Sequence, residues 1–199
     1  MQIITKDSRL LSEQQETKFE KMKGIALVIF IALHDIGLSC PSQDTAPLYR
    51  YWNSKTVDHF YTTDANEIGT TIPNRKGKHG YIYEGIQCHL YTHQVESSVP
   101  LYRYWKRSSR DHFYTTNPEE IGITIRGQTG KHGYKSEGIV GYCMSCKTPK
   151  TVPLYRYWRS NRADHFYTTN IKEIGTAEPG RNGRHGYKSE GITCYVLPG

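Results

Sequence analysis

The stretch PLYRYW-NSKTV-DHFYTT, residues 47–63, decides how this chain folds, because the chain contains it three times. It returns as PLYRYW-KRSSR-DHFYTT at 100–116 and as PLYRYW-RSNRA-DHFYTT at 153–169, so each step is 53 residues long. A later Glu-Gly-Ile triplet keeps the same step, and 22 positions are identical in the three copies. Units of one length without insertions between them indicate a repeat architecture, in which neighbouring units complete a shared core.

The quoted stretch itself predicts a β-hairpin. Two short runs rich in aromatic residues and threonine flank five polar residues, which is the pattern of two strands and their connection. If Trp52 lies opposite Asp58, then Arg50 lies opposite Phe60 and the two share a face of the hairpin. A shift of one residue would move every side chain to the other face.

A helical turn and a last strand are predicted after each hairpin. Asp64 with Glu67 three residues later forms a capping box, and Gly69 ends the turn. The segment 79–81 is predicted to open the last strand, in which Gly85 indicates a bulge or a close backbone approach.

Three such copies that bury one another predict a mainly β fold closed around a pseudo-threefold axis. We expect a β-trefoil-like array of three 53-residue repeats with a short helical turn per repeat, in one closed domain. The repeats span 47–99, 100–152 and 153–199. The alternative arrangement is three small antiparallel sheets around an axis, with the helical turn outside.

Residues 1–40 lie outside the repeats and are predicted to be an N-terminal extension with a signal peptide. A basic start precedes the apolar run 24–33, and small residues before Cys40 predict cleavage there. The run is shorter than the roughly 20 residues of a membrane span, so we expect a secreted, extracellular protein without stable membrane insertion. A membrane anchor and a buried helix are the alternatives. Translation starts at either Met1 or Met22.

The net charge of +7 belongs to the repeats, because residues 1–40 hold equal numbers of acidic and basic side chains. Much of the excess lies in the variable hairpin tips, such as Lys106-Arg107 and Arg159. A basic surface attracts polyanions, and nucleic acid is the usual first candidate. For an exported chain we expect glycans instead, acidic ones among them, and no nucleic acid. A solvated basic face without a partner is the alternative.

The cysteines agree with export without defining their pairing. Cleavage near Cys40 leaves four, which allow three connectivities: Cys88, Cys143, Cys146 and Cys194. We expect one or two structural disulfides, with buried thiols as the alternative. The CxxC at 143–146 has no second CxxC and no histidine pair at a spacing that would complete a zinc site.

The candidate ligand-binding residues are a tyrosine, an aspartate and two histidines that every copy keeps. Aromatic rings beside polar side chains are typical of sugar sites, where rings pack on C–H edges and polar groups bind hydroxyls. The candidates are Tyr51, Asp58, His59 and His79 in the first copy, Tyr104, Asp111, His112 and His132 in the second, and Tyr157, Asp164, His165 and His185 in the third. Structural roles are the alternative; Arg50, for instance, is a candidate partner of Asp58 or Glu84.

Catalysis is not predicted. The sequence lacks HExxH, GxSxG and a Gly-rich phosphate loop, and three copies of one constellation suit multivalent binding better than a single asymmetric active site. We therefore predict no enzyme activity, no catalytic residue, no metal site and no cofactor.

The segments LYRYW, DHFYTT, Glu-Ile-Gly and HGY-x-x-EGI resemble an uncharacterised repeat family, a domain of unknown function. Its bacterial, fungal and animal members carry LYRxxN, HFYTT and GWxYEG-type segments, often attached to secreted or surface proteins. The resemblance covers residues 47–196 and implies no particular activity; association with exported enzymes implies a carbohydrate-binding or cell-surface-binding module. Asn53 keeps the family pattern at the hairpin tip in the first repeat only.

We therefore predict a secreted, lectin-like carbohydrate-binding repeat protein with up to three equivalent sites. The alternative is an extracellular scaffold or adhesion module that binds proteins or anionic surfaces through its basic turns. The oligomeric state has no signature in the sequence.

Overall fold

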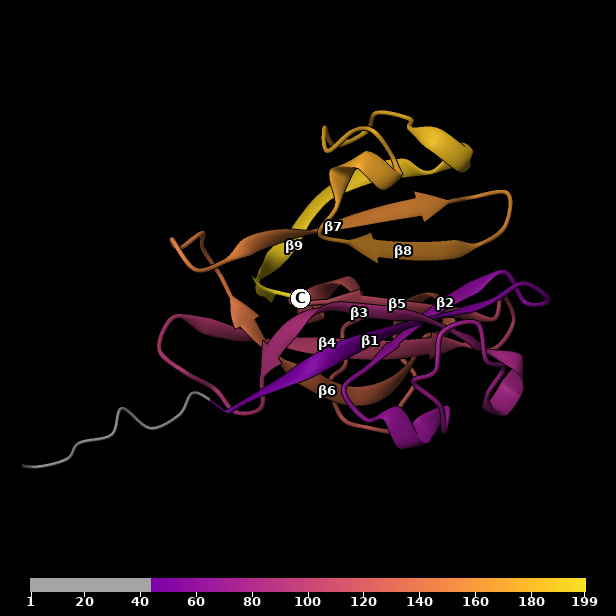
Figure 1. Cartoon of the computed structure of the whole chain (residues 1–199), viewed down its shortest axis with the longest axis horizontal. Coiled ribbons are helices and arrows are strands. Elements are labelled where there is room, and N and C mark those ends of the chain that lie inside the picture. Colours follow the sequence, from indigo (N-terminus) through magenta and orange to yellow (C-terminus); the bar gives the residue numbers. More distant parts are fainter. Residues whose placement is uncertain (1–43) are drawn as a thin grey trace, which may run out of the picture. The chain divides into compact units, whose positions relative to one another are not determined.

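The computed structural model describes residues 44–199, which form nine β-strands joined into one hydrogen-bonded sheet (Figure 1). The strands are β1 (Thr45–Asn53), β2 (Asp58–Thr62), β3 (Ile82–Tyr91), β4 (Ser98–Lys106), β5 (Asp111–Thr115), β6 (Lys135–Met144), β7 (Val152–Arg159), β8 (Asp164–Thr168) and β9 (Lys188–Pro198). The mainly β fold is confirmed. The predicted leader, the cleavage near Cys40 and the alternative start lie outside the described residues.

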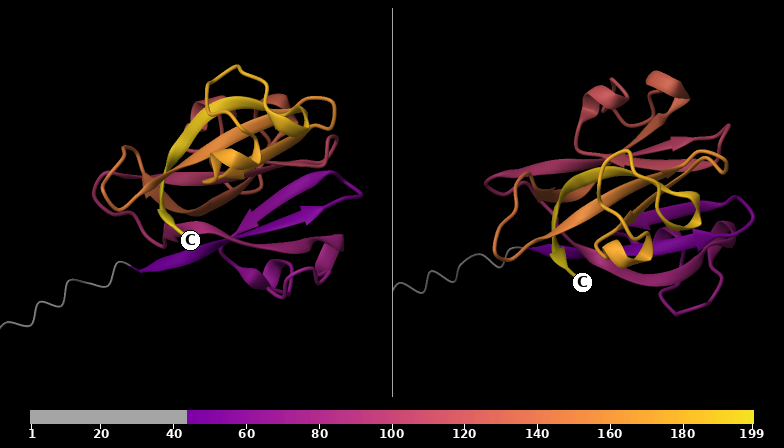
Figure 2. Two further views of the ribbon diagram at one scale, coloured as in Figure 1. Left: turned by 45° about the horizontal axis from the view of Figure 1, so that its top comes forward. Right: turned by 90° about the horizontal axis from the view of Figure 1, so that it is seen from above.

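Each repeat contributes three antiparallel strands, with its first strand in the middle. In the first copy β1 pairs with β2 on one side and with β3 on the other, and β4–β6 and β7–β9 follow the same plan. The strands of the third repeat, β7 to β9, are drawn in orange to yellow; they lie together in Figure 1, and Figure 2 shows them from two further directions. In residues 44–199 no helix is long and apolar enough to cross a membrane.

The hairpin is present, but the predicted pairing is wrong by one residue. Trp52 lies opposite His59, and Asn53 extends the strand to pair with Asp58. The turn is tighter than the polar run suggested, because the Val57 amide donates to the Asn53 carbonyl at 2.8 Å. Trp52 and His59 therefore share one face of the hairpin, instead of Trp52 and Asp58.

The helical turns are 3-10 helices of three residues. They span Ala65–Glu67, Pro118–Glu120 and Ile171–Glu173, and a second set spans Lys78–Gly80, Lys131–Gly133 and Arg184–Gly186. Asp64 caps the first turn as predicted, because its side chain accepts a hydrogen bond from the Asn66 amide at 2.9 Å. The return contact of the capping box is absent among the described residues, since Thr62 Oγ1 accepts from the Asp64 amide and Glu67 points elsewhere.

The last strand begins later than predicted, at Ile82 instead of His79. His79 belongs to the second 3-10 turn, and its φ of 56° lies in the left-handed region, which turns the chain before the strand. The predicted bulge is confirmed: β1 pairs with Gly85 and then with Tyr83, and the φ of Gly85 is 130°.

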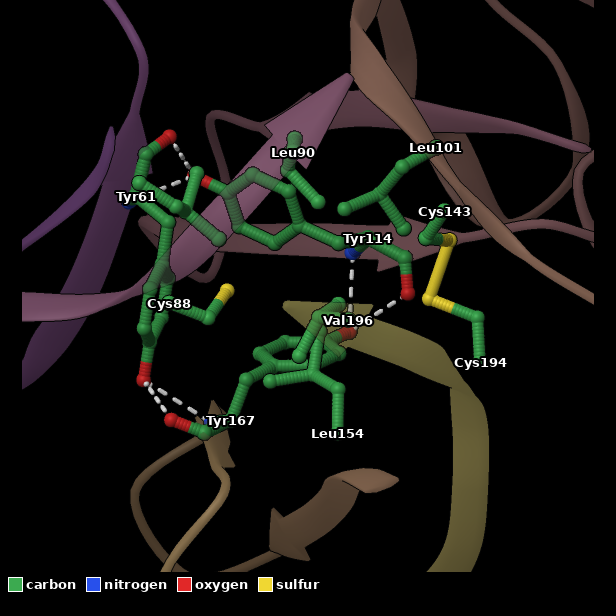
Figure 3. Close-up of a cluster of buried hydrophobic side chains, with 11 residues drawn as sticks. Tyr61, Cys88, Leu90, Leu101, Tyr114, Cys143, Leu154, Tyr167, Cys194 and Val196 are labelled. Atoms are coloured by element: carbon green, nitrogen blue, oxygen red, sulfur yellow. Dashed lines mark hydrogen bonds between the residues drawn. A yellow bond between two sulfur atoms is a disulfide. The ribbon is translucent and has the colours of Figure 1, made fainter. Parts of the chain in front are cut away.

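Three tyrosines join the repeats at the centre of the fold (Figure 3). The Tyr114 hydroxyl accepts from the Tyr61 amide at 2.7 Å and donates to the Tyr61 carbonyl at 2.8 Å. Tyr167 makes the same pair of bonds to Tyr114, and Tyr61 makes them to Tyr167. Side-chain hydroxyls thus satisfy backbone groups at the edges of β2, β5 and β8, where no neighbouring strand pairs with them. Burial raises the pKa of all three phenols well above the usual value, so they remain protonated donors.

The ring of copies closes through the last strands. β9 pairs with β3, where His89 lies opposite Leu197, so the third repeat contacts the first. A disulfide links Cys143 to Cys194, with their Cα atoms 6.1 Å apart, and Figure 3 shows it beside the tyrosines. Cys88 is a buried free thiol and Cys146 an exposed one. This closed arrangement is compatible with the predicted β-trefoil-like array.

Candidate functional site

An aspartate of each repeat holds a histidine of the next one. Asp58 accepts a hydrogen bond from the His112 amide at 2.9 Å, another from His112 Nδ1 at 2.7 Å, and a third from the Tyr81 hydroxyl. Because a carboxylate only accepts hydrogen bonds, Nδ1 of His112 carries the proton in this contact. Nε2 of the same ring lies on the opposite edge, away from Asp58. Asp111 holds His165 in the same way, and Asp164 holds His59.

These three aspartates also form the one group of acidic side chains in residues 44–199 that lie close enough to hold a cation. Their ligand oxygens lie within 4.8 Å of one another, and all three are buried. Each carboxylate already accepts two bonds from a histidine and one from a tyrosine hydroxyl of its own repeat. The donor set explains the buried charge without an ion, and the cluster acts as the support that orients the histidines.

An arginine–glutamate contact is a second link between the same pairs of repeats. Two hydrogen bonds of 2.8 Å connect the Arg103 guanidinium to Glu67, and Arg103 Nε lies 2.7 Å from Glu137 of its own repeat. Burial alone would raise the pKa of Glu67, but the bonds from Arg103 and Thr62 outweigh it and lower the pKa. Arg156 with Glu120 and Arg50 with Glu173 repeat the contact.

A cleft of about 840 Å³ opens between the first and second repeats, above these contacts. Its lining combines aromatic rings with charged side chains from both repeats. The first repeat supplies Phe60, Glu67, His79 and Tyr81, and the second supplies Arg103, Trp105, His112 and Glu137.

The rings in this cleft are held in a fixed stack. Trp105 lies on His112 with ring centroids 4.3 Å apart, and Phe60 meets His112 edge-on at 4.7 Å. Arg103 covers Phe60 at 4.9 Å. Because Asp58 fixes His112 from below, the half-buried indole face of Trp105 is a prepositioned surface of the cleft.

The corresponding cleft between the third and first repeats is smaller, about 380 Å³. Its lining repeats the same side-chain types at equivalent positions: Arg50, Trp52, His59, Glu84, Phe166, Glu173, Ile174, His185 and Tyr187. It also contains Arg159, whose guanidinium lies 5.8 Å from the centroid of the Tyr187 ring and fills part of the space.

The predicted site residues separate into two layers. Tyr51, Tyr104 and Tyr157 are fully buried, and so are Asp58, Asp111 and Asp164, so these six support the clefts from beneath. His59, His112 and His165 are 8% exposed; His112 lines the larger cleft and His59 the smaller one. His79, His132 and His185 are exposed, and His79 lines the larger cleft and His185 the smaller one.

The grouping of these residues also differs from the expected one. We expected the candidates of one copy to meet, whereas the larger cleft brings His79 of the first copy to His112 of the second. Period and motif place equivalent residues in each repeat, but they do not show which neighbour completes a site.

Sequence reasoning missed the tryptophan, the arginine and the two glutamates of the cleft. All four recur in every copy, and the protein has no tryptophan other than Trp52, Trp105 and Trp158. Their recurrence was the available signal. We read the arginine as a possible partner of Glu84 or Asp58 instead; the Glu84 contact is present at 3.0 Å, while the partner from the neighbouring copy went unpredicted.

No match was found among curated proteins or among solved structures. A family model, by contrast, matches residues 47–197, the span of all three repeats. The chain therefore belongs to the family described as a domain of unknown function, DUF5648.

Proposed function

We propose that the chain is a secreted, non-enzymatic, lectin-like protein that binds carbohydrate in the clefts between its repeats. The observation that carries this proposal is the cleft between the first and second repeats. Its volume of about 840 Å³ lies in the range of small-molecule sites, which is about 300–1,000 Å³.

The side chains of the cleft suit a sugar in two ways. The half-buried indole of Trp105, which stacks on His112, offers an apolar surface for the C–H edges of a pyranose. The carboxylates of Glu67 and Glu137 are about a third exposed, so they can accept hydrogen bonds from hydroxyls while Arg103 holds them in place. These groups recur in each repeat, which supports up to three related sites in one molecule.

Export is supported by the disulfide between Cys143 and Cys194, since disulfides persist mainly in oxidising compartments. It is also supported by the apolar run at 24–33 in the sequence.

A glycan array tests the proposal. Discrete sugar hits that weaken in Trp105→Ala support it, because the substitution removes the stacking surface of the larger cleft and leaves Trp52 and Trp158 in place. Circular dichroism of the same variant shows whether the fold is retained. An array without sugar hits would refute carbohydrate binding.

One observation favours the alternative, a scaffold that binds proteins or anionic surfaces. The hairpin tips expose arginines for which no ion-pair partner is present in residues 44–199, among them Arg107, Arg110 and Arg162. Binding that spreads over all polyanions and disappears in high salt would support this alternative.

A further inference from the structure

The three places between repeats share one floor and differ in the hairpin tips that surround it. Phenylalanine, glutamate, tryptophan and histidine recur in each copy, whereas the tips 53–57, 106–110 and 159–163 share no position among all three. The tips therefore set any difference in ligand preference between the clefts.

The first tip leaves its cleft open. In the second and third repeats the strand ends in a cation that lies over a tyrosine: Lys106 over Tyr134 at 5.5 Å and Arg159 over Tyr187 at 5.8 Å. Asn53 occupies this place in the first repeat, and its amide donates to the His79 carbonyl at 2.9 Å. The shorter, uncharged side chain agrees with the greater volume of this cleft, about 840 Å³ against 380 Å³.

The second tip adds positive charge to this same cleft. Arg107 and Arg110 line it, whereas the equivalent residues are Ser54 and Val57 for the cleft between the third and first repeats. At the junction of the second and third repeats they are Ser160 and Ala163. At these two tip positions, therefore, only the cleft between the first and second repeats has arginines; the other two junctions have none there.

These two arginines are available to a ligand. Arg103 forms ion pairs with Glu67 and Glu137. Arg107 and Arg110, by contrast, are exposed and have no ion-pair partner within residues 44–199. Thr56 also lines this cleft, and its buried hydroxyl has no hydrogen-bond partner among residues 44–199.

Guanidinium groups bind carboxylate and sulfate with paired hydrogen bonds, which makes arginine the preferred side chain for such anions. We infer that the cleft between the first and second repeats binds an acidic sugar, a pyranose that carries a carboxylate or a sulfate. The ring packs on Trp105, and its anionic group lies at Arg107 and Arg110. The inference rests on the proposed carbohydrate binding and narrows it to one acidic site per molecule.

Titration calorimetry with ligands that share one ring tests this inference. Methyl β-glucuronide and glucose 6-sulfate should each bind with a stoichiometry of one. At low salt, the affinity of the tighter of these two ligands should be about tenfold higher than that of methyl β-glucoside. Which acidic ligand binds more tightly distinguishes the carboxylate from the sulfate. In the double variant Arg107→Ala/Arg110→Ala the affinity for both should fall to that for the glucoside.

Two further variants control for net charge and for the position of the site. Lys147→Ala/Lys150→Ala removes the same charge from an exposed loop outside the cleft and should leave the preference unchanged. The triple variant Lys106→Asn/Ser160→Arg/Ala163→Arg should raise the stoichiometry for the acidic sugar from one to two. Its backbone suits the change, because φ is 51° at Ala163 and 55° at Arg110.

The outcomes separate this inference from the function on which it rests. Equal affinities for the glucuronide, the sulfate and the glucoside would overturn the acidic preference and leave carbohydrate binding intact. Inorganic sulfate that binds as tightly as glucose 6-sulfate would show that the ring contributes nothing, which overturns sugar recognition. Binding of none of the three sugars would overturn both.

Discussion

Glu67 of the first repeat holds Arg103 of the second through two hydrogen bonds of 2.8 Å, on the edge of the cleft between them. The carboxylate also accepts from Thr62 of its own hairpin. A single side chain thus ties the 3-10 turn to its hairpin and to the next repeat, so the contacts that shape the cleft also hold the copies together.

Replacing Arg103 by methionine should destabilise the protein by about 3 kcal/mol. The Arg103 side chain is 9% exposed, and its loss leaves two carboxylates without their main partner. Since these carboxylate side chains are about a third exposed, the low end of the range for a broken buried ion pair applies. Urea unfolding measures the change. Arg107→Ala is the matched control and should stay within about 0.5 kcal/mol of the parent, because Arg107 is exposed. Equal effects of the two substitutions would contradict a structural role for Arg103.

Stability should decrease in acid below the ordinary glutamate pKa of 4.5. Burial would raise the pKa of Glu67, Glu120 and Glu173, but hydrogen bonds from the arginines outweigh it and lower all three. A folded-state pKa below the unfolded value stabilises the protein above pH 4.5, and this contribution is lost as the pH falls through the lowered value. Unfolding curves between pH 7 and pH 3 test this. A Glu67→Gln protein should depend less steeply on pH, and an unchanged slope would assign the acid sensitivity to other groups.

Removal of one hydroxyl from the three mutually hydrogen-bonded tyrosines, Tyr61, Tyr114 and Tyr167, should lower the stability of the whole fold. Tyr114→Phe leaves the amide and the carbonyl of Tyr61 without their partner in a buried place, at about 1–3 kcal/mol for each unsatisfied group. Tyr102→Phe is the control, since no hydrogen bond of its hydroxyl is present in residues 44–199 and the ring is half-buried. Thermal unfolding by circular dichroism compares them; a Tyr114→Phe protein as stable as the control would mean that water replaces the hydroxyl.

The four cysteines of the repeats should differ in reactivity. Without reductant, iodoacetamide should modify Cys146, which is exposed, and spare Cys88, which is buried and whose pKa burial raises. Peptide mapping by mass spectrometry identifies the modified sites. Labelling of Cys88 in the native protein would show that the core opens.

The double variant Cys143→Ala/Cys194→Ala should lose about 4 kcal/mol of folding stability, because the disulfide closes a loop over a sequence separation of 51.

Asn53→Arg should weaken ligand binding at the larger cleft and leave the fold intact. The third repeat already carries arginine at this position, where it lies over Tyr187 beside the smaller cleft. The expected change is a loss of affinity for the cleft's ligand of about tenfold, roughly 1.4 kcal/mol, measured by calorimetry. Lys106→Ala, at the tip of the second repeat, should not affect this cleft. Unchanged affinity in Asn53→Arg would show that the ligand binds outside the space over Tyr81.

Local signals in the sequence predicted what depends on a few neighbouring residues. The hairpin, the cap by Asp64 and the bulge at Gly85 each follow from short patterns with a known backbone geometry, and the structure contains all three. The pairing of Trp52 was missed because the polar run fixes where the turn lies but not how many of its residues extend the strands.

The site itself depends on contacts that no single repeat contains. Asp58 and His112 are 54 residues apart, and nothing in the period distinguishes a contact within one copy from a contact with the next. From the sequence, His59 is a candidate ligand-binding residue, whose replacement by alanine would affect binding and not folding. The structure gives it a structural effect, since the buried Asp164 would lose a donor.

The pairing of β9 with β3 has a consequence for chain connectivity. Pro47 and Leu197 both lie opposite His89, on its two sides, so they are separated by two strand spacings, roughly 10 Å. Three or four residues span that distance. A circular permutant that joins position 199 to position 45 and opens the exposed loop 92–97 would keep every strand pair and every cleft. The fold thus prescribes a cyclic order of the copies, and any of the three can come first.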